Sequence, residues 1–180
     1  MHIKRQSYVL IKVGTIIDGN GGEPILNGAI LIKDGLILAV GKTEDIVSPD
    51  GASVEIYDYP DKVAIPGMID CHTHHNGFGD GTPMDDIAEY NDEILTLQSA
   101  KNARASLYTG VTTIRENGPK NLTMFRIRDA IQQGIMLGPR MVLCGRPMSI
   151  IGGHMGYFGS ESTGPDEARG MVRQLIKEGA

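Results

Sequence analysis

Ile65-Pro66-Gly67-Met68-Ile69-Asp70-Cys71-His72-Thr73-His74 separates two parts of the chain that have different sequence patterns. Its apolar start is typical of a buried strand, and two histidines stand one residue apart at its end. In a strand, residues i and i+2 point to the same side, so His72 and His74 are expected to project side by side. Two such imidazoles suit a divalent metal such as zinc. Structural histidines are the alternative, and His75 is expected to face the other way.

On the C-terminal side of this stretch, predicted strands alternate with predicted helices. β-branched or apolar character predicts strands at residues 68–74, 111–115 and 141–144. Helical periodicity covers residues 92–108, a segment capped by Asn121 and ended by Gly134, and a segment from Pro165 to Gly179. This order predicts parallel strands and an α/β fold. Three such units fit either an open sheet or the first part of a TIM-like (β/α)8 barrel, and the periodicity does not separate the two.

On the N-terminal side, the chain has the pattern of short strands joined by tight turns. The predicted strands are residues 8–17, 28–32, 36–40 and 54–58, with a hairpin turn at Asp34-Gly35. Their spacing predicts a small β-sandwich or an open sheet. We therefore expect a β-rich small domain at residues 1–63 and an α/β domain at residues 64–180. A complete barrel needs about 250 residues, so the second domain is expected to be an incomplete barrel in this chain.

The composition excludes several classes of protein. The 180 residues are 41% hydrophobic and 22% charged, which is typical of a soluble globular protein, and the net charge of −5 argues against a nucleic-acid binder. No apolar run is long enough to span a membrane. The basic start at residues 1–7 leads into no cleavage site, so no signal peptide is expected. Cys71 and Cys144 form no disulfide framework, which favours the cytoplasm, and Cys71 is expected to be a small core residue.

Several motifs resemble those of the amidohydrolase superfamily of metal-dependent hydrolases. Residues 65–74 resemble its P-G-x-I-D-x-H-x-H signature, and residues 103–115 resemble its A-x-x-x-x-x-x-G-V-T-T-x-R pattern. The strand-rich N-terminus is similar to the small β-domain that precedes the barrel in that superfamily. Gly138-Pro139-Arg140 and Gly152-Gly153-His154 resemble the branch that contains imidazolonepropionase-like and prolidase-like enzymes.

This resemblance implies both an activity and a metal site. It implies hydrolysis of C–N amide-type bonds by a metal-activated water, with amino-acid derivatives, dipeptides or cyclic amides as substrates. It implies that His72 and His74 bind the more buried of one or two divalent ions, which we expect to be zinc. The other metal ligands and the catalytic base would come from later strands, beyond Ala180. The 180-residue chain alone is therefore expected to be inactive.

Four further residues are candidates for the site. The resemblance implies that His154 and Tyr157, in the glycine-rich loop after the third strand, contact the substrate, and a loop histidine in solvent is the alternative. Arg115 and Glu116 end the second strand and are expected to point at the same mouth of the fold as the histidine pair. Arg115 could bind a substrate carboxylate or pair with Glu116. Asp70 could orient a metal ligand, or it could accept backbone N–H groups at the start of its strand.

The expected partner is a small-molecule substrate, with neither nucleic acid nor membrane involved. An open barrel edge would expose an unpaired strand and apolar helix faces. We therefore expect a homo-oligomer, or association with the missing remainder of the barrel. Two other functions fit the same sequence. One is a non-catalytic amidohydrolase-like fragment that serves binding or assembly, and the other is a metal-dependent deaminase on the same scaffold.

Overall fold

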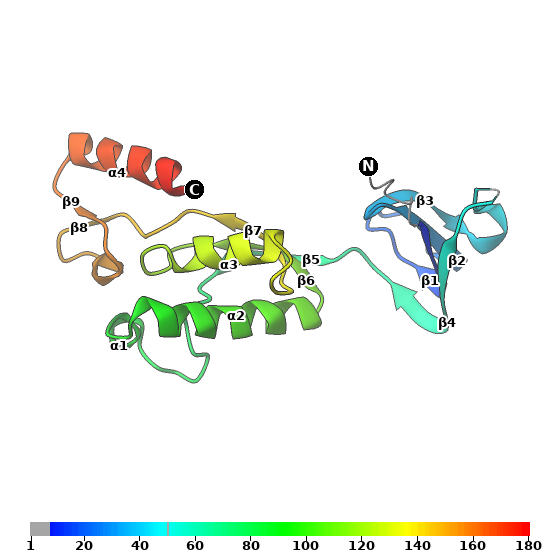
Figure 1. The fold of residues 1–180 in the computed structure, drawn as a ribbon, viewed down its shortest axis with the longest axis horizontal. Helices are drawn as coiled ribbons and strands as arrows, with labels where there is room; N and C mark the ends of the chain where they lie inside the picture. Colours follow the sequence, from blue (N-terminus) through cyan, green and yellow to red (C-terminus); the bar gives the residue numbers. More distant parts are fainter. Residues whose placement is uncertain (1–7, 50) are drawn as a thin grey trace, which may run out of the picture. The chain divides into compact units, whose positions relative to one another are not determined.

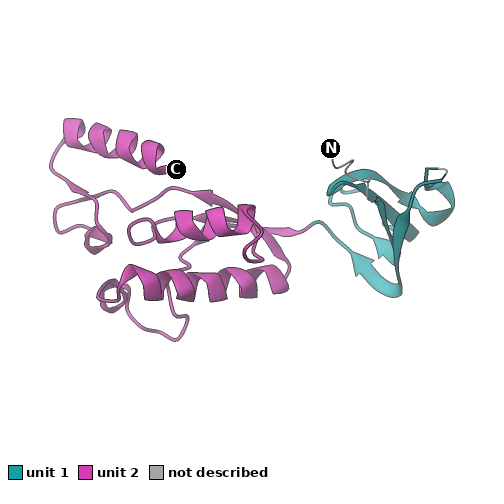
Figure 2. Ribbon diagram, in the orientation of Figure 1, with its two compact units in different colours: residues 1–66 teal, residues 67–180 magenta. Residues whose placement is uncertain are grey.

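The computed structural model describes residues 8–49 and 51–180. The basic start at residues 1–7 lies outside the described residues. The chain divides into two compact units between Pro66 and Gly67 (Figure 2). No helix within the described ranges is long and apolar enough to cross a membrane.

The N-terminal unit contains one four-stranded sheet in the order β3-β2-β1-β4. Its elements are β1 (Tyr8–Ile16), β2 (Ile25–Lys33), β3 (Leu36–Lys42), a short 3-10 helix η1 (Thr43–Asp45) and β4 (Val54–Ala64). The strands β1, β2 and β3 pair antiparallel, and β4 pairs parallel with β1. The predicted hairpin turn between β2 and β3 is confirmed. Its residues Asp34 and Gly35 have φ values of 49° and 83°, as a two-residue hairpin turn of this twist requires.

Of the two predicted alternatives for this unit, a small β-sandwich and an open sheet, the described residues form the open sheet. The strand β4 extends the sheet beside β1, so no strand is left to build a second layer. Gly14 allows this pairing, since a Cβ atom there would collide with the carbonyl oxygen of Pro60. A core of Tyr8, Leu10, Ala29 and Leu31 covers one side of the sheet. Large apolar side chains on β3 and β4 stay exposed: Leu36, Ile37, Leu38, Val40, Ile56, Tyr57, Tyr59 and Val63.

The C-terminal unit confirms the predicted alternation of strands and helices. Its main elements are β5 (Met68–Thr73), α2 (Asp92–Tyr108), β6 (Val111–Glu116), α3 (Thr123–Gln132), β7 (Arg140–Leu143) and α4 (Pro165–Glu178). The three strands form a parallel sheet in the order β5-β6-β7, and α2 and α3 connect them (Figure 1). The sequence predicted α2 at its observed bounds, and it predicted the start of α4 at Pro165 and its end at Gly179.

Two helices cover one face of this sheet. The shared core is formed by Ala103, Ile114, Met124, Phe125, Ile127, Met141 and Leu143. Val142 is exposed between buried Met141 and Leu143, so the other face of β7 has no cover among the described residues. Cys71 is also exposed, which corrects the prediction of a core position. The reason is that every residue of β5 except Thr73 is exposed, so the strand has little cover among the described residues.

Several short elements lie beyond the carboxyl ends of the strands. They are α1 (Met84–Ala88), β8 (Ser149–Ile150), the 3-10 helix η2 (Gly156–Phe158) and β9 (Glu161–Ser162). The sequence analysis did not anticipate α1. Its Ile87 forms a small apolar cluster with Leu95, Met155 and Phe158, so the loop after β5 and the loop after β7 pack on each other.

The start of α3 also differs from the prediction. The residue before the helix is Leu122, and no side chain caps it. Asn121, the predicted cap, has a φ of 48°, and its amide donates to the two carboxylate oxygens of Asp92 at 3.1 and 3.0 Å. That amide therefore links the starts of α2 and α3 instead of capping α3.

Candidate functional site

The two histidines at the end of β5 meet. The Nε2 atoms of His72 and His74 lie 3.2 Å apart, and the rings stand edge to face at 71°. Two nitrogens bound to one tetrahedral zinc ion at about 2.0–2.1 Å would be about 3.3–3.4 Å apart. The pair thus has the spacing of two ligands on one ion. The same spacing also permits a hydrogen bond between the rings when one Nε2 carries the proton.

An irregularity in β5 includes His72, the first residue of this pair. In the ladder with β6, Asp70 pairs with Ile114 and Thr73 pairs with Glu116, so β5 contains one extra residue between the two pairs. The carboxylate of Asp70 accepts the backbone N–H of His72 at 3.0 Å. This contact is the second of the two alternatives for Asp70, although the residue is exposed rather than buried. An extra residue of this kind bends a strand and changes where its side chains point.

The environment of His74 favours a neutral ring. Burial lowers the pKa of His74, the negative charge of Glu116 opposes that effect, and His72, His154 and His75 lower the pKa further. The Nδ1 atom of His74 is buried and has no hydrogen-bond partner in the described part of the chain. Neutral imidazole is the form that binds metal ions.

The next histidine faces the opposite way, as predicted. His75 is 6% exposed and Glu116 is 0% exposed. The Nδ1 atom of His75 donates to Oε2 of Glu116 at 3.0 Å, and Nε2 lies 3.1 Å from the hydroxyl of Ser106. Both ring nitrogens of His75 are therefore occupied, and this ring cannot join the pair at the end of β5.

A buried amide fixes the turn that follows. Asn76 is 1% exposed, and its Nδ2 donates to the hydroxyls of Ser99 on α2 and Thr123 on α3, at 2.8 and 3.2 Å. Its Oδ1 accepts the backbone N–H of Lys120 at 2.7 Å. The sequence pattern did not predict this network. A signal was available, because Ser99 lies among the apolar residues of α2, and a buried hydroxyl requires a partner.

The prediction that Arg115 and Glu116 point at the same mouth is wrong, because their side chains lie on opposite faces of the sheet. Arg115 is exposed between buried Ile114 and buried Glu116, because alternate residues of a strand point to opposite faces. The guanidinium donates to the carbonyl oxygen of Cys71 at 3.4 Å. Arg115 therefore contacts the end of β5 at the residue before His72, and its side chain points away from Glu116.

The loop after β7 presents its candidate residues at the surface. His154 is exposed, and Tyr157 is 44% exposed. Met155 and Phe158 are buried in the cluster with α1 and hold this loop. Burial and the nearby charge of Asp85 raise the pKa of Tyr157, so its hydroxyl stays protonated at neutral pH.

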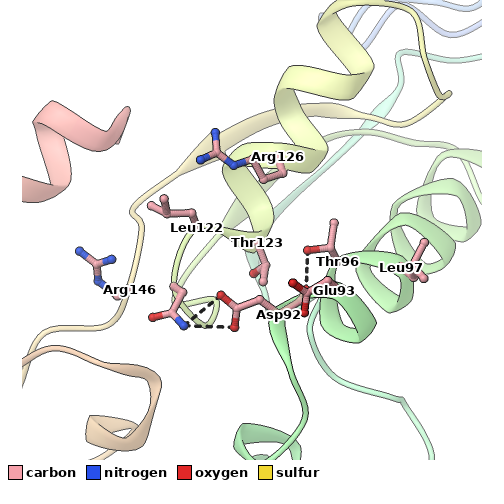
Figure 3. Close-up of a pocket in the computed structure, with 9 residues that line it drawn as sticks. Asp92, Glu93, Thr96, Leu97, Leu122, Thr123, Arg126 and Arg146 are labelled. Carbon is pink, nitrogen blue, oxygen red and sulfur yellow. Dashed lines mark hydrogen bonds between the residues drawn. The ribbon is translucent and has the colours of Figure 1, made fainter.

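A hollow of about 760 Å³ is lined by residues other than the histidines (Figure 3). It is lined by Asp92, Glu93, Thr96, Leu97, Asn121, Leu122, Thr123, Arg126 and Arg146. Asp92 is already bound by Asn121, and Arg146 pairs with Glu178 at 2.6 Å. Around the histidine pair, no third His, Cys, Asp or Glu completes a set of three metal ligands within residues 8–49 and 51–180.

Comparison with known proteins identifies a family and several relatives of this chain. The model of the family described as "Amidohydrolase family" matches residues 63–180. Ochratoxinase from Aspergillus niger is 27% identical over 203 residues, and the match covers 95% of this chain and 40% of that protein. Imidazolonepropionase from Fusobacterium nucleatum subsp. nucleatum is 27% identical over 175 residues, which covers 84% of this chain and 41% of that protein.

A solved structure is similar over nearly the whole chain. The crystal structure of a Xaa-Pro dipeptidase with bound methionine in the active site matches with a TM-score of 0.79 and 25% identity, and covers 96% of this chain and 45% of that one. This chain therefore spans less than half the length of the proteins that it resembles.

Proposed function

The chain belongs to the amidohydrolase family, and from this premise we propose that the protein hydrolyses C–N amide-type bonds with a divalent metal held by His72 and His74. The observation that carries the proposal is the 3.2 Å approach of the two Nε2 atoms. The proposed metal is zinc, with one or two ions. We further propose that β5, β6 and β7 are the first three strands of an eight-stranded barrel, whose active site lies at the carboxyl ends of its strands.

The residues of this chain fit part of a metal site. A bound divalent ion lowers the pKa of its water to about 7 and polarises a substrate carbonyl. His72 and His74 would bind through Nε2, and the lowered pKa of His74 keeps that ring in the ligating form. Two ligands leave a zinc ion under-coordinated. The proposal therefore requires further ligands and a base from other strands of the barrel.

Three residues would bind the substrate. The proposed substrates are amino-acid derivatives, dipeptides or cyclic amides, and one similar structure is a dipeptidase that holds methionine. Arg115 offers an exposed guanidinium beside β5, which suits a substrate carboxylate. His154 and Tyr157 offer a ring nitrogen and a protonated hydroxyl from the loop after β7, and these suit a carbonyl or carboxylate oxygen.

Metal analysis tests the proposal directly. We expect the purified protein to contain zinc or another divalent ion, and the combined substitutions His72→Ala and His74→Ala to reduce the bound metal to background. The matched control is His154→Ala, which removes an exposed imidazole and should retain the metal. An unchanged metal content in the double variant would contradict the proposal.

A further inference from the structure

The carboxylate of Glu116 is fully buried and accepts several hydrogen bonds. The hydroxyl of Thr73 donates to Oε2 at 2.9 Å. The backbone N–H of His75 lies 3.1 Å from Oε1 and 3.0 Å from Oε2, and Nδ1 of His75 lies 3.0 Å from Oε2. A buried carboxylate is costly unless such bonds compensate for its lost hydration.

The donors belong to the two residues that flank His74. Thr73 is also the ladder partner of Glu116, and its carbonyl oxygen accepts the N–H of Asn117 at 3.0 Å. The backbone is therefore held on both sides of His74 by one side chain from the neighbouring strand. Rotation of the peptide units around His74 would break at least one of these bonds.

We infer that Glu116 is a positioning residue for the histidine pair. By holding Thr73 and His75, its carboxylate fixes the backbone of His74 and keeps the two Nε2 atoms at the spacing of metal ligands. Glu116 is bonded to neither ring of the pair, so it acts through the chain that carries His74. The relevance of this role to metal binding rests on the proposed function, whereas the ring geometry can be tested without metal.

The chemistry of the side chain is specific. A carboxylate offers two oxygens that accept bonds from several directions, and every neighbour here is a donor. A glutamine of nearly the same shape would keep one accepting oxygen and turn an NH2 group toward these donors. Buried groups that are left without partners destabilise the conformation that buries them. The substitution Glu116→Gln should therefore shift the turn that carries His74.

Zinc affinity separates positioning from simple stabilisation. The purified protein is stripped of metal and titrated with Zn²⁺ at a temperature where every variant is folded. Residues that orient metal ligands typically change affinity by about 10–100-fold, so Glu116→Gln should weaken Zn²⁺ binding by that factor. The matched control is Glu178→Gln, the same chemical change in another carboxylate that is bonded to several donors, and it should leave the affinity unchanged. Equal affinities in wild type and Glu116→Gln would overturn the inference.

A milder pair of variants covers the case in which Glu116→Gln does not fold. Thr73→Val removes one donor to Glu116 at nearly constant volume, and Thr73→Ser keeps the hydroxyl. The valine variant should bind Zn²⁺ more weakly than the serine variant. If the two bind Zn²⁺ equally, the inference fails.

A measurement without metal separates this inference from the proposed function. In the metal-free protein, nuclear Overhauser contacts between the rings of His72 and His74 should be present in the wild type and lost in Glu116→Gln. If the wild type binds no Zn²⁺ at the pair, the proposed function fails, and the ring contacts still decide the role of Glu116. Contacts that persist in Glu116→Gln would overturn the inference whatever the metal does.

Discussion

The end of β5 has two sides that differ in how their polar groups are satisfied. The buried side consists of His75, Asn76 and Glu116, and each has several hydrogen-bond partners. The open side consists of His72, His74 and Arg115, which have few partners within the described residues. One turn of the chain thus separates side chains that stabilise the turn from side chains that remain available to bind a ligand. Substitutions on the two sides should have different consequences.

The largest loss of stability is expected for His75→Leu. This change leaves the buried Glu116 carboxylate without its ring partner, and removing a hydrogen-bond partner from a buried charged group costs about 3 kcal/mol. For a chain of this size, that corresponds to a fall in the melting temperature of about 6–12 °C. Thermal unfolding measures it, and exposed His154→Leu is the control. A fall of less than about 2 °C would show that the buried side contributes no more to stability than the open side does.

A smaller loss is expected for Asn76→Ala. The substitution removes the acceptor of the Lys120 N–H and a donor to Ser99 and Thr123. Because the hydroxyls of Ser99 and Thr123 can find other partners, the expected cost is about 2 kcal/mol in the free energy of unfolding. Chemical denaturation measures this value, and exposed Asn20→Ala provides the comparison. Equal midpoints for Asn76→Ala and Asn20→Ala would contradict the structural role of the buried amide.

The half-buried pair of Arg146 and Glu178 should give an intermediate, pH-dependent effect. The hydrogen bond that the Glu178 carboxylate accepts from Arg146 is the main cause that lowers the pKa of Glu178 below 4.5. A lowered carboxyl pKa contributes stability above the unfolded value, and this contribution is lost as the pH falls through the folded pKa. Glu178→Gln should therefore lower the melting temperature by about 2–4 °C at pH 7, for a pair worth about 1 kcal/mol.

The sign of this effect can be checked with one series of melting curves. The difference between wild type and Glu178→Gln should stay constant from pH 7 down to about pH 5, and should shrink toward zero below pH 4.5. A difference that grows as the solution becomes more acidic would mean that the carboxylate is not stabilised by Arg146.

The smallest change in stability is expected for Arg115→Ala on the open side. An exposed side chain with one long hydrogen bond should contribute within about 0.5 kcal/mol of zero. If Arg115 binds a substrate carboxylate, the same change should raise KM for a dipeptide by about tenfold or more, at a melting temperature close to that of the wild type. Lys101→Ala, on the surface of α2, is the control for removal of a positive charge. A marked loss of stability without a change in KM would place Arg115 with the buried side.

Local signals predicted much of the C-terminal unit. The pattern of apolar residues and the turn at Gly110 gave α2, and Pro165 and Gly179 gave α4, because caps and periodicity depend only on neighbours in the chain. The alternation of strand residues also predicted that His72 and His74 meet and that His75 faces away.

Features that depend on distant residues were not predictable in this way. Alternation places Glu116 on the same face as buried Ile114, but it does not reveal the donors that satisfy a carboxylate there, because Thr73 and His75 lie more than 40 residues earlier in the chain. The same limit applies to Asn121, whose preference for a helix cap was outweighed by bonds to Asp92. The single sheet of the N-terminal unit depends on β4 pairing with β1, and no local pattern specifies that pairing.

In the loop after β7, buried residues that anchor the loop alternate with exposed residues. Met155, in a left-handed conformation with φ of 59°, and Phe158 anchor the loop against α1, while His154 and Tyr157 project outward. Anchor and display positions are thus separate along the chain. Under the proposed function, a library that varies residues 154 and 157 and retains both anchors should yield folded proteins with altered selectivity, which makes this loop a starting point for directed evolution.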